Sequence, residues 1–229
     1  MRAAFFDVGD TLVEGWLSGE ALHRIVRDDL VAAFGERAWY DALVAADIRP
    51  ADRELHRQET NRWYRSWFEA NGISCDIDID RLRSVFAGPL ERVSTPVPGA
   101  ADAVRWCKAR GLRIVLVTNT LSRGDAEVLR DWQRAGLGDV IDAVVSSHSA
   151  GWEKPHPEIY RRALELAGVE PREAFMVGDD PVCDVQGAQA VGLRAVWRRT
   201  AHHRLPADVR PDAVLERLDE LPAAVGPWL

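Results

Sequence analysis

The chain has 229 residues, of which 47% are hydrophobic and 28% charged, so it can bury one large core or a core with a smaller second domain. Its formal net charge is -7 and like charges do not cluster, which argues against nucleic acid as a partner. The three cysteines form no C-x-x-C pair, so neither a disulfide framework nor a structural zinc site is expected.

The first element is a short apolar run, Ala3–Phe6, which predicts a buried strand. Asp7 interrupts this run too early for a signal sequence or a membrane span, so we expect a cytoplasmic protein with no membrane partner. Similar apolar runs follow at Ile114–Val117, Ala143–Val145, Phe175–Val177 and Ala195–Trp197. Helical patterns lie between or after them, at Ala100–Ala109, Ala126–Arg134, Pro157–Ala167 and Val185–Val191. This alternation predicts an α/β fold with a doubly wound, parallel, Rossmann-like sheet.

The stretch 16–94 departs from this alternation. Its apolar positions, such as Leu22, Ile25 and Val26, follow helical spacing, and no strand pattern is evident. We therefore predict a core of residues 1–15 and 95–229 with an inserted all-α cap of residues 16–94. An apolar face on the cap could mediate dimers, so monomer and homodimer both remain open.

Polar segments follow four of the predicted strands. In an open parallel sheet, ligands bind beyond the carboxyl ends of the strands, so these segments are expected to converge on one cleft. They are Asp7–Leu12, Thr118–Asn119, Gly151–Pro155 and Gly178–Asp184.

The cleft would gather several carboxylates around one cation. The candidates are Asp7, Asp10, Asp179, Asp180 and Asp184, with Lys154 nearby. Carboxylates a few ångströms apart repel by about 4 kcal/mol per pair at an effective dielectric near 20, so a bound cation is expected among them. An all-oxygen cluster suits Mg²⁺, and the expected ligands are Asp7, the Gly9 carbonyl, Asp179 and Asp184, the last directly or through water.

This constellation has the parts that phosphoryl transfer requires. Asp7 can act as the nucleophile, and Mg²⁺ with Lys154 can neutralise the phosphoryl oxygens. The Thr118 hydroxyl and backbone amides near Gly9 and Asn119 can donate hydrogen bonds to the same group. Lys154 is one of only two lysines in the chain, which otherwise uses arginine as its cation. We therefore expect a phosphorylated small molecule as substrate.

The motifs resemble those of the haloacid dehalogenase-like hydrolase superfamily in order and spacing. Asp7, Thr11 and Leu12 match the first motif and Thr118 matches the second. Lys154 with Pro155 matches the third motif, and Gly178-Asp179 with Asp184 matches the fourth. The resemblance implies a helical cap that closes over the substrate and a covalent aspartyl intermediate on Asp7.

One position departs from the pattern. Phosphatases of this superfamily usually carry an acid–base Asp two residues after the nucleophile, where this chain has Gly9. An acid of this kind contributes roughly 10²- to 10⁴-fold to the rate. The preferred interpretation is that Asp10 takes this role, since glycine lets the loop re-aim the neighbouring carboxyl group. Two alternatives are open: a substrate that needs no acid, including that of a metal-independent haloacid dehalogenase, or a silent phospho-ligand-binding partner protein.

Aromatic and imidazole side chains offer weaker signals. Trp16 and Trp152 lie near motifs, and both are predicted to line the cleft, Trp16 as a substrate contact. His203 is predicted to lie on the surface. The cap aromatics Tyr64 and Phe68, four residues apart, are predicted to form cap core.

Overall fold

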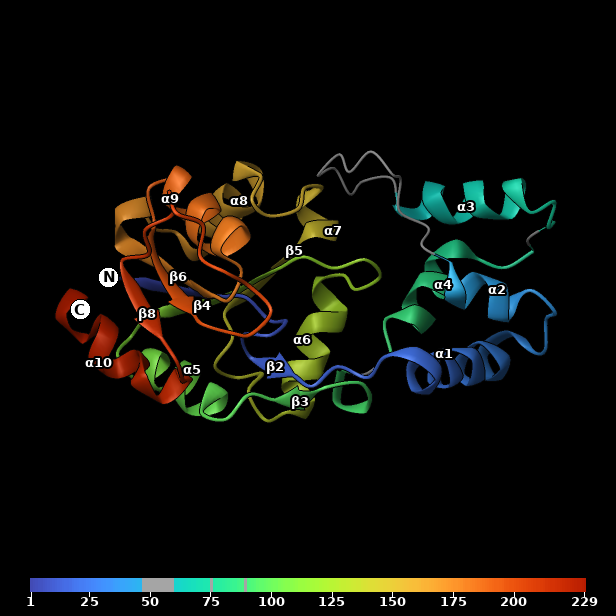
Figure 1. The fold of residues 1–229 in the computed structure, drawn as a ribbon, viewed down its shortest axis with the longest axis horizontal. Coiled ribbons are helices and arrows are strands. Elements are labelled where there is room, and N and C mark those ends of the chain that lie inside the picture. The colour runs from blue at the N-terminus through green and yellow to red at the C-terminus, as the bar shows by residue number, and fades with distance from the viewer. Residues whose placement is uncertain (47–59, 75, 89) are drawn as a thin grey trace.

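The core of the molecule is a six-stranded parallel sheet. The computed structural model describes residues 1–46, 60–74, 76–88 and 90–229 (Figure 1). The strands are β1 (Ala3–Phe6), β4 (Arg113–Thr118), β5 (Ala143–Ser146), β6 (Ala174–Gly178), β7 (Arg194–Arg198) and β8 (Ala213–Leu215), in the order β5-β4-β1-β6-β7-β8. The predicted doubly wound α/β fold is thereby confirmed. The sequence did not reveal β8, because this edge strand has only three residues and Val214 is exposed.

Helices cover both faces of the sheet. Side chains alternate along β1, so that Ala4 and Phe6 belong to one core cluster and Ala3 and Phe5 to the other. The first cluster includes residues of α5 (Ala100–Ala109), α6 (Asp125–Arg134) and α10 (Leu221–Val225). The second includes residues of α8 (Pro157–Ala167) and α9 (Gly187–Ala190), and the short helix α7 (Ser147–Ala150) precedes α8. Because helices cover both faces of the sheet, a ligand can reach the sheet only at the ends of the strands.

A separate group of helices lies at one end of the molecule (Figure 1). It comprises α1 (Gly19–Phe34), α2 (Tyr40–Ala45), α3 (Thr60–Ala70) and α4 (Ile79–Phe86). Tyr64 and Phe68 are buried in the apolar cluster that these helices share, so the prediction that they form cap core is confirmed. The division into a core of residues 1–15 and 95–229 and a cap of residues 16–94 stays a prediction.

A two-stranded ribbon lies where the chain enters and leaves this helical group. In it, β2 (Val13–Glu14) pairs antiparallel with β3 (Thr95–Pro96).

Within the described part of the chain, no helix combines the length and apolarity needed to cross a bilayer.

A second connection between the helical group and the sheet runs through the loop that follows β4. Arg83 of α4 donates to the Ser122 carbonyl at 2.7 Å, and the hydroxyls of Tyr64 and Ser122 lie 3.2 Å apart. Arg123 donates to the carbonyl of Gly88. These contacts hold the loop after β4 against the helices α3 and α4.

Candidate active site

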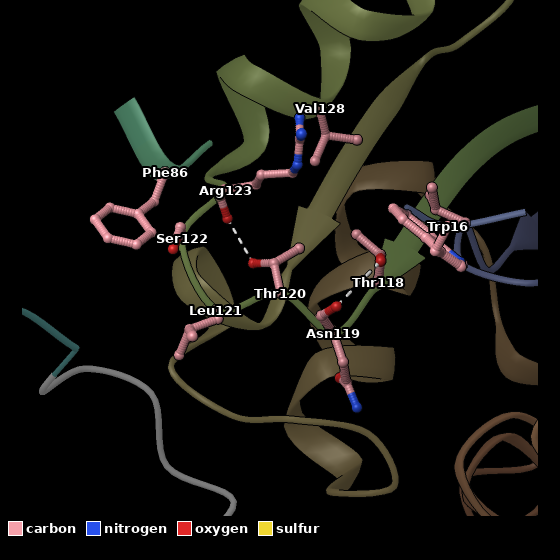
Figure 2. A pocket seen from close by; sticks show the side chains of 11 residues that line it. Trp16, Phe86, Thr118, Asn119, Thr120, Leu121, Ser122, Arg123 and Val128 are labelled. Carbon is pink, nitrogen blue, oxygen red and sulfur yellow. Dashed lines mark hydrogen bonds between the residues drawn. The ribbon is translucent and has the colours of Figure 1, made fainter. Parts of the chain in front are cut away.

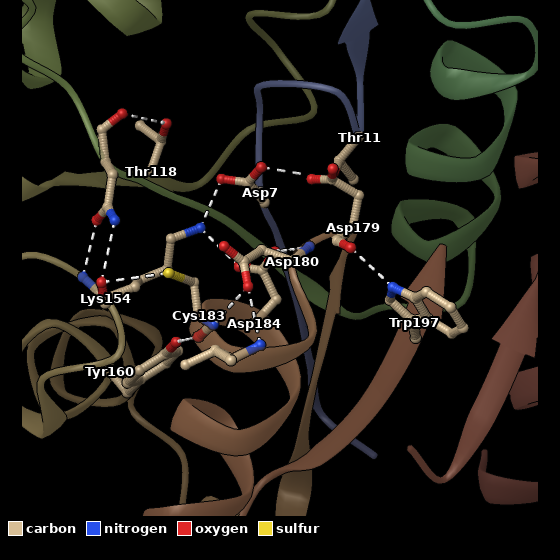
Figure 3. A network of polar contacts seen from close by, with 12 residues as sticks. Asp7, Thr11, Thr118, Lys154, Tyr160, Asp179, Asp180, Cys183, Asp184 and Trp197 are labelled. Atoms are coloured by element: carbon tan, nitrogen blue, oxygen red, sulfur yellow. Dashed lines mark hydrogen bonds and ion pairs between the residues drawn. The ribbon is translucent and has the colours of Figure 1, made fainter. Parts of the chain in front are cut away.

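Three buried carboxylates meet at the carboxyl ends of the central strands (Figure 3). Asp7 directly follows β1 and donates its backbone N–H to the Val177 carbonyl of β6 at 2.9 Å, so it lies beside Asp179, which follows β6. Asp184 lies on a π-helical turn, Pro181–Gln186. One carboxylate oxygen from each of the three aspartates lies within 4.8 Å of the others. The sheet therefore brings together the three aspartates that the sequence named as metal ligands.

The loop after β6 is shaped to hold Asp184 in place. A Cβ built on Gly178 would collide with the Asp184 carboxyl group, so only glycine allows this approach. The Asp184 Oδ2 accepts from the Asp180 backbone N–H at 3.0 Å. Asp180 itself caps the turn, because its Oδ1 accepts from the backbone N–H groups of Val182 and Cys183. Asp180 is thus engaged with backbone donors rather than with the three-carboxylate cluster.

Lys154 is the cation that faces this cluster. Its side chain is 2% exposed, and Nζ lies 2.5 Å from Asp7 Oδ1 and 2.7 Å from Asp184 Oδ1. Burial acts to lower the pKa of Lys154, but the charges of Asp184 and Asp7 outweigh it and raise this pKa above its usual value. The Asn119 amide exchanges two hydrogen bonds with the Lys154 backbone, donating to its carbonyl at 3.1 Å and accepting from its N–H at 2.8 Å. The Asn119 side chain therefore positions Lys154.

One lysine does not neutralise three carboxylates. Burial, together with the charges of Asp7 and Asp10, raises the pKa of Asp179 to about 7. Burial also raises the pKa of Asp184 to about 7, in spite of the adjacent Lys154. Both carboxyls thus hold protons far more tightly than exposed aspartates do. A site of buried oxygen donors with excess negative charge fits a hard divalent cation such as Mg²⁺.

Asp10 and Trp16 form a pair beside Gly9. Asp10 adopts a left-handed backbone conformation with φ of 50°, and its Oδ1 accepts from the Trp16 indole N–H at 3.1 Å. Its backbone carbonyl accepts from Arg198. A Cβ on Gly9 would meet the Trp16 ring at 3.5 Å, an ordinary contact distance. Position 9 therefore has space for the first side-chain atom, with the Trp16 ring beside it.

Several further residues contact Asp179, and of these only Thr11 lies in a segment that was predicted to reach the cleft. The Thr11 hydroxyl donates to Asp179 Oδ1 at 3.2 Å, and Trp197 donates its indole N–H to the Asp179 carbonyl at 2.7 Å. The Thr200 hydroxyl donates to Asp179 Oδ2 at 3.4 Å, and His203 Nε2 lies 3.6 Å from the same oxygen. The prediction that His203 is a surface residue overlooked this contact. Among Trp197, Thr200 and His203, only Trp197 could have been predicted from the sequence, because it ends an apolar run and strand ends converge on the site.

Two adjoining pockets open at this end of the sheet. An acidic pocket of about 290 Å³ is lined by Asp7, Asp10, Lys154, Asp179, Asp184 and His203, among others. A second pocket of about 270 Å³ lies beside it and extends along the loop after β4 to Phe86 of α4 (Figure 2). Gly9, Trp16, Thr118 and Asn119 line both. Trp152 lines neither pocket and instead stacks on His156, with ring centroids 3.9 Å apart, so its predicted place in the cleft was wrong.

Comparison with known proteins identifies the family. Residues 1–192 match the family model of the haloacid dehalogenase-like hydrolases. The chain is a haloacid dehalogenase-like hydrolase. It is 32% identical over 212 residues to haloacid dehalogenase-like hydrolase domain-containing protein 3 of Mus musculus, an alignment that covers 85% of this chain and 80% of the relative. It is 34% identical over 205 residues to glyceraldehyde 3-phosphate phosphatase of Pyrococcus abyssi, with 86% and 81% covered.

Its fold is also shared with a solved structure. The crystal structure of a HAD phosphatase from Thermococcus onnurineus superposes with a TM-score of 0.64 at 25% identity, covering 99% of this chain and 98% of the other. The resemblance that was based on four motifs is therefore confirmed across nearly the whole chain.

Proposed function

We propose that this hydrolase is a Mg²⁺-dependent phosphatase that acts on a phosphorylated small molecule through an aspartyl-phosphate on Asp7. The observation that carries the proposal is the placement of Asp7, buried at the end of β1, 2.5 Å from Lys154 and in one cluster with Asp179 and Asp184. The relative in Pyrococcus abyssi, a glyceraldehyde 3-phosphate phosphatase of the same family, supports the same class of reaction for this chain.

The metal would be held by Asp7, Asp179 and Asp184 together with the Gly9 carbonyl. The three carboxylates offer the oxygen donors that Mg²⁺ prefers, and burial together with the neighbouring carboxylates raises the pKa values of Asp179 and Asp184. When bound, Mg²⁺ supplies positive charge for the phosphoryl oxygens.

The residues of the chain account for the remaining steps. An Asp7 oxygen attacks phosphorus as the bond to the leaving oxygen breaks, while Lys154 and the Thr118 hydroxyl interact with the phosphoryl oxygens. The leaving alkoxide requires a proton, which we assign to the Asp10 carboxyl because it faces the acidic pocket next to Gly9. Water then attacks the phosphorus of the aspartyl-phosphate while the Asp10 carboxylate takes up a proton from it, which releases phosphate and regenerates Asp7 and the protonated Asp10.

The test compares two leaving groups in parent and variant proteins. An aryl phosphate has a good leaving group and needs little help from an acid, whereas an alkyl phosphate depends on it. With Mg²⁺ present, Asp7→Asn should abolish turnover of both substrates. Asp10→Asn should lower alkyl phosphate turnover by roughly 10²-fold or more and leave aryl phosphate turnover within a few-fold of the parent.

The other outcomes separate the alternatives. No turnover by the parent, but turnover by Gly9→Asp, would mean that the scaffold binds phosphorylated ligands without hydrolysing them. The space beside Gly9 makes this variant a fair test, since its first side-chain atom meets only the Trp16 ring. Halide release from a 2-haloacid that persists with EDTA would identify a metal-independent dehalogenase instead.

A further inference from the structure

The second pocket bears on the kind of leaving group that the substrate has. Its location makes it the place for the leaving group, because it begins at Thr118 and Gly9 beside the catalytic Asp7 and runs away from the carboxylates. The pocket has a volume of about 270 Å³, close to the lower end of the range for small-molecule sites. A leaving group of three or four heavy atoms would leave most of it unfilled.

Arg123 is the one charged residue among the described residues that line this pocket. Its guanidinium is already paired with the Asp131 carboxylate and also donates to the Gly88 carbonyl. Burial of Arg123 lowers the pKa of the guanidinium, and the charge of Asp131 acts against this effect. Among the described residues that line the pocket, a carboxylate or second phosphate would therefore find no unpaired cation, which is unfavourable.

The remaining lining offers apolar surface and a few polar groups. Val8, Phe86, Leu121 and Val128 line the pocket, and Figure 2 shows Phe86 and Trp16 on opposite sides of it. The nearby hydroxyls are already engaged, because Thr120 donates to the Arg123 carbonyl at 2.5 Å and Ser122 lies 3.2 Å from the Tyr64 hydroxyl. Such a lining favours a flat or apolar face on the ligand over a chain of hydroxyl groups.

We propose that the leaving group is an uncharged, ring-bearing alcohol of about nucleoside size, so that the substrate is its phosphate monoester. This inference rests on the proposed phosphatase function and adds to it a leaving-group class. It excludes small leaving groups that carry a carboxylate, such as serine or glycolate.

The experiment compares kcat/KM of the parent protein for four phosphates in Mg²⁺. Acetyl phosphate has a small acyl group and reports on Asp7 chemistry without the pocket. Uridine 5′-monophosphate has a leaving group with a neutral ring system, glycerol phosphate has a small neutral leaving group, and the leaving group of phosphoglycolate bears a carboxylate. We expect uridine monophosphate to exceed the last two by at least about tenfold.

Two substitutions in the pocket sharpen the comparison. Phe86→Ala should lower kcat/KM for uridine monophosphate by about tenfold more than it lowers kcat/KM for acetyl phosphate. Leu121→Arg adds a cation to the lining of the pocket, so it should raise kcat/KM for phosphoglycolate by about tenfold. Leu121→Gln, similar in size but neutral, is the matched control and should not produce this gain.

Failure of this inference can be told apart from failure of the phosphatase proposal. If acetyl phosphate is turned over but phosphoglycolate or glycerol phosphate equals or exceeds uridine monophosphate, the assignment of the leaving group is wrong. If no phosphate is turned over, binding to the parent is measured by calorimetry. Uridine monophosphate that binds more tightly than phosphoglycolate supports the pocket assignment, and the reverse order overturns it.

Discussion

Replacing Asp179 by asparagine should stabilise the metal-free protein at alkaline pH. The pKa of Asp179 is raised from its usual value near 3.8 to about 7 by burial and by the charges of Asp7 and Asp10. The folded state therefore binds a proton that the unfolded state has released across this interval. Stability from this group is present below the unfolded pKa and is lost as pH rises through about 7.

The size of the change in stability follows from the pKa shift of Asp179. One pKa unit corresponds to about 1.4 kcal/mol, so between about pH 5.5 and pH 8 the ionisation of this single carboxyl costs the folded parent roughly 2 kcal/mol. The amide of the Asp179→Asn variant carries no charge, so the variant avoids this loss. The substitution also removes one of the charges that act on Asp184.

The assay is urea unfolding of parent and variant in EDTA at both pH values. Between about pH 5.5 and about pH 8, the free energy of unfolding of Asp179→Asn should rise by roughly 2 kcal/mol relative to the parent. Mg²⁺ at alkaline pH should then stabilise the parent more than the variant, because an amide is the poorer ligand. Asp180→Asn is the matched control, since Asp180 caps a turn through its hydrogen bonds with backbone N–H groups.

Two results would refute this reasoning. If Asp179→Asn and the parent lose stability in parallel as pH rises, the buried carboxyl does not titrate in this range. If Mg²⁺ stabilises both proteins equally, Asp179 is not among the residues that hold the metal.

Two further predictions concern contacts that hold the site together. Lys154→Met leaves Asp7 and Asp184 without their shared cation, so denaturant unfolding in EDTA at about pH 8 should show a loss of about 3–5 kcal/mol; a variant as stable as the parent would contradict it. Tyr64→Phe and Ser122→Ala each remove the hydroxyl contact between α3 and the loop after β4, so each should raise KM by roughly fivefold, equivalent to about 1 kcal/mol. The double variant should be no worse than either single one, and additive effects would show that the two hydroxyls do not act as a pair.

The strand ends were predictable because the sheet leaves little freedom there. Asp7, Thr118 and Asp179 each occupy the first position after an apolar run or close to it, and parallel pairing of β4, β1 and β6 brings these positions together. Lys154 was predicted from the order of the motifs. Its two ion pairs with Asp7 and Asp184 are consistent with that place in the site.

The contacts that the sequence did not predict come from segments without a repeating pattern. Thr200 and His203 reach Asp179 from the loop after β7, where neither spacing nor apolar periodicity marks them. Trp152 lies close to Lys154 in the chain, yet it stacks on His156 because local turns, not sequence distance, set the direction of a side chain. The two-residue strands β2 and β3 are too short to give an alternating pattern.

Gly9 is the position at which sequence and structure bear on the mechanism differently. In the sequence, glycine at position 9 indicates that the usual acid–base aspartate is missing. In the structure, the Trp16 ring lies beside Gly9, and the same indole donates to the Asp10 carboxylate at 3.1 Å. Asp10 is held in a left-handed conformation that few residues other than glycine, asparagine and aspartate adopt readily. The proposed acid role rests on the position of the Asp10 carboxyl group at the edge of the acidic pocket, and Asp10→Asn is the variant that tests it.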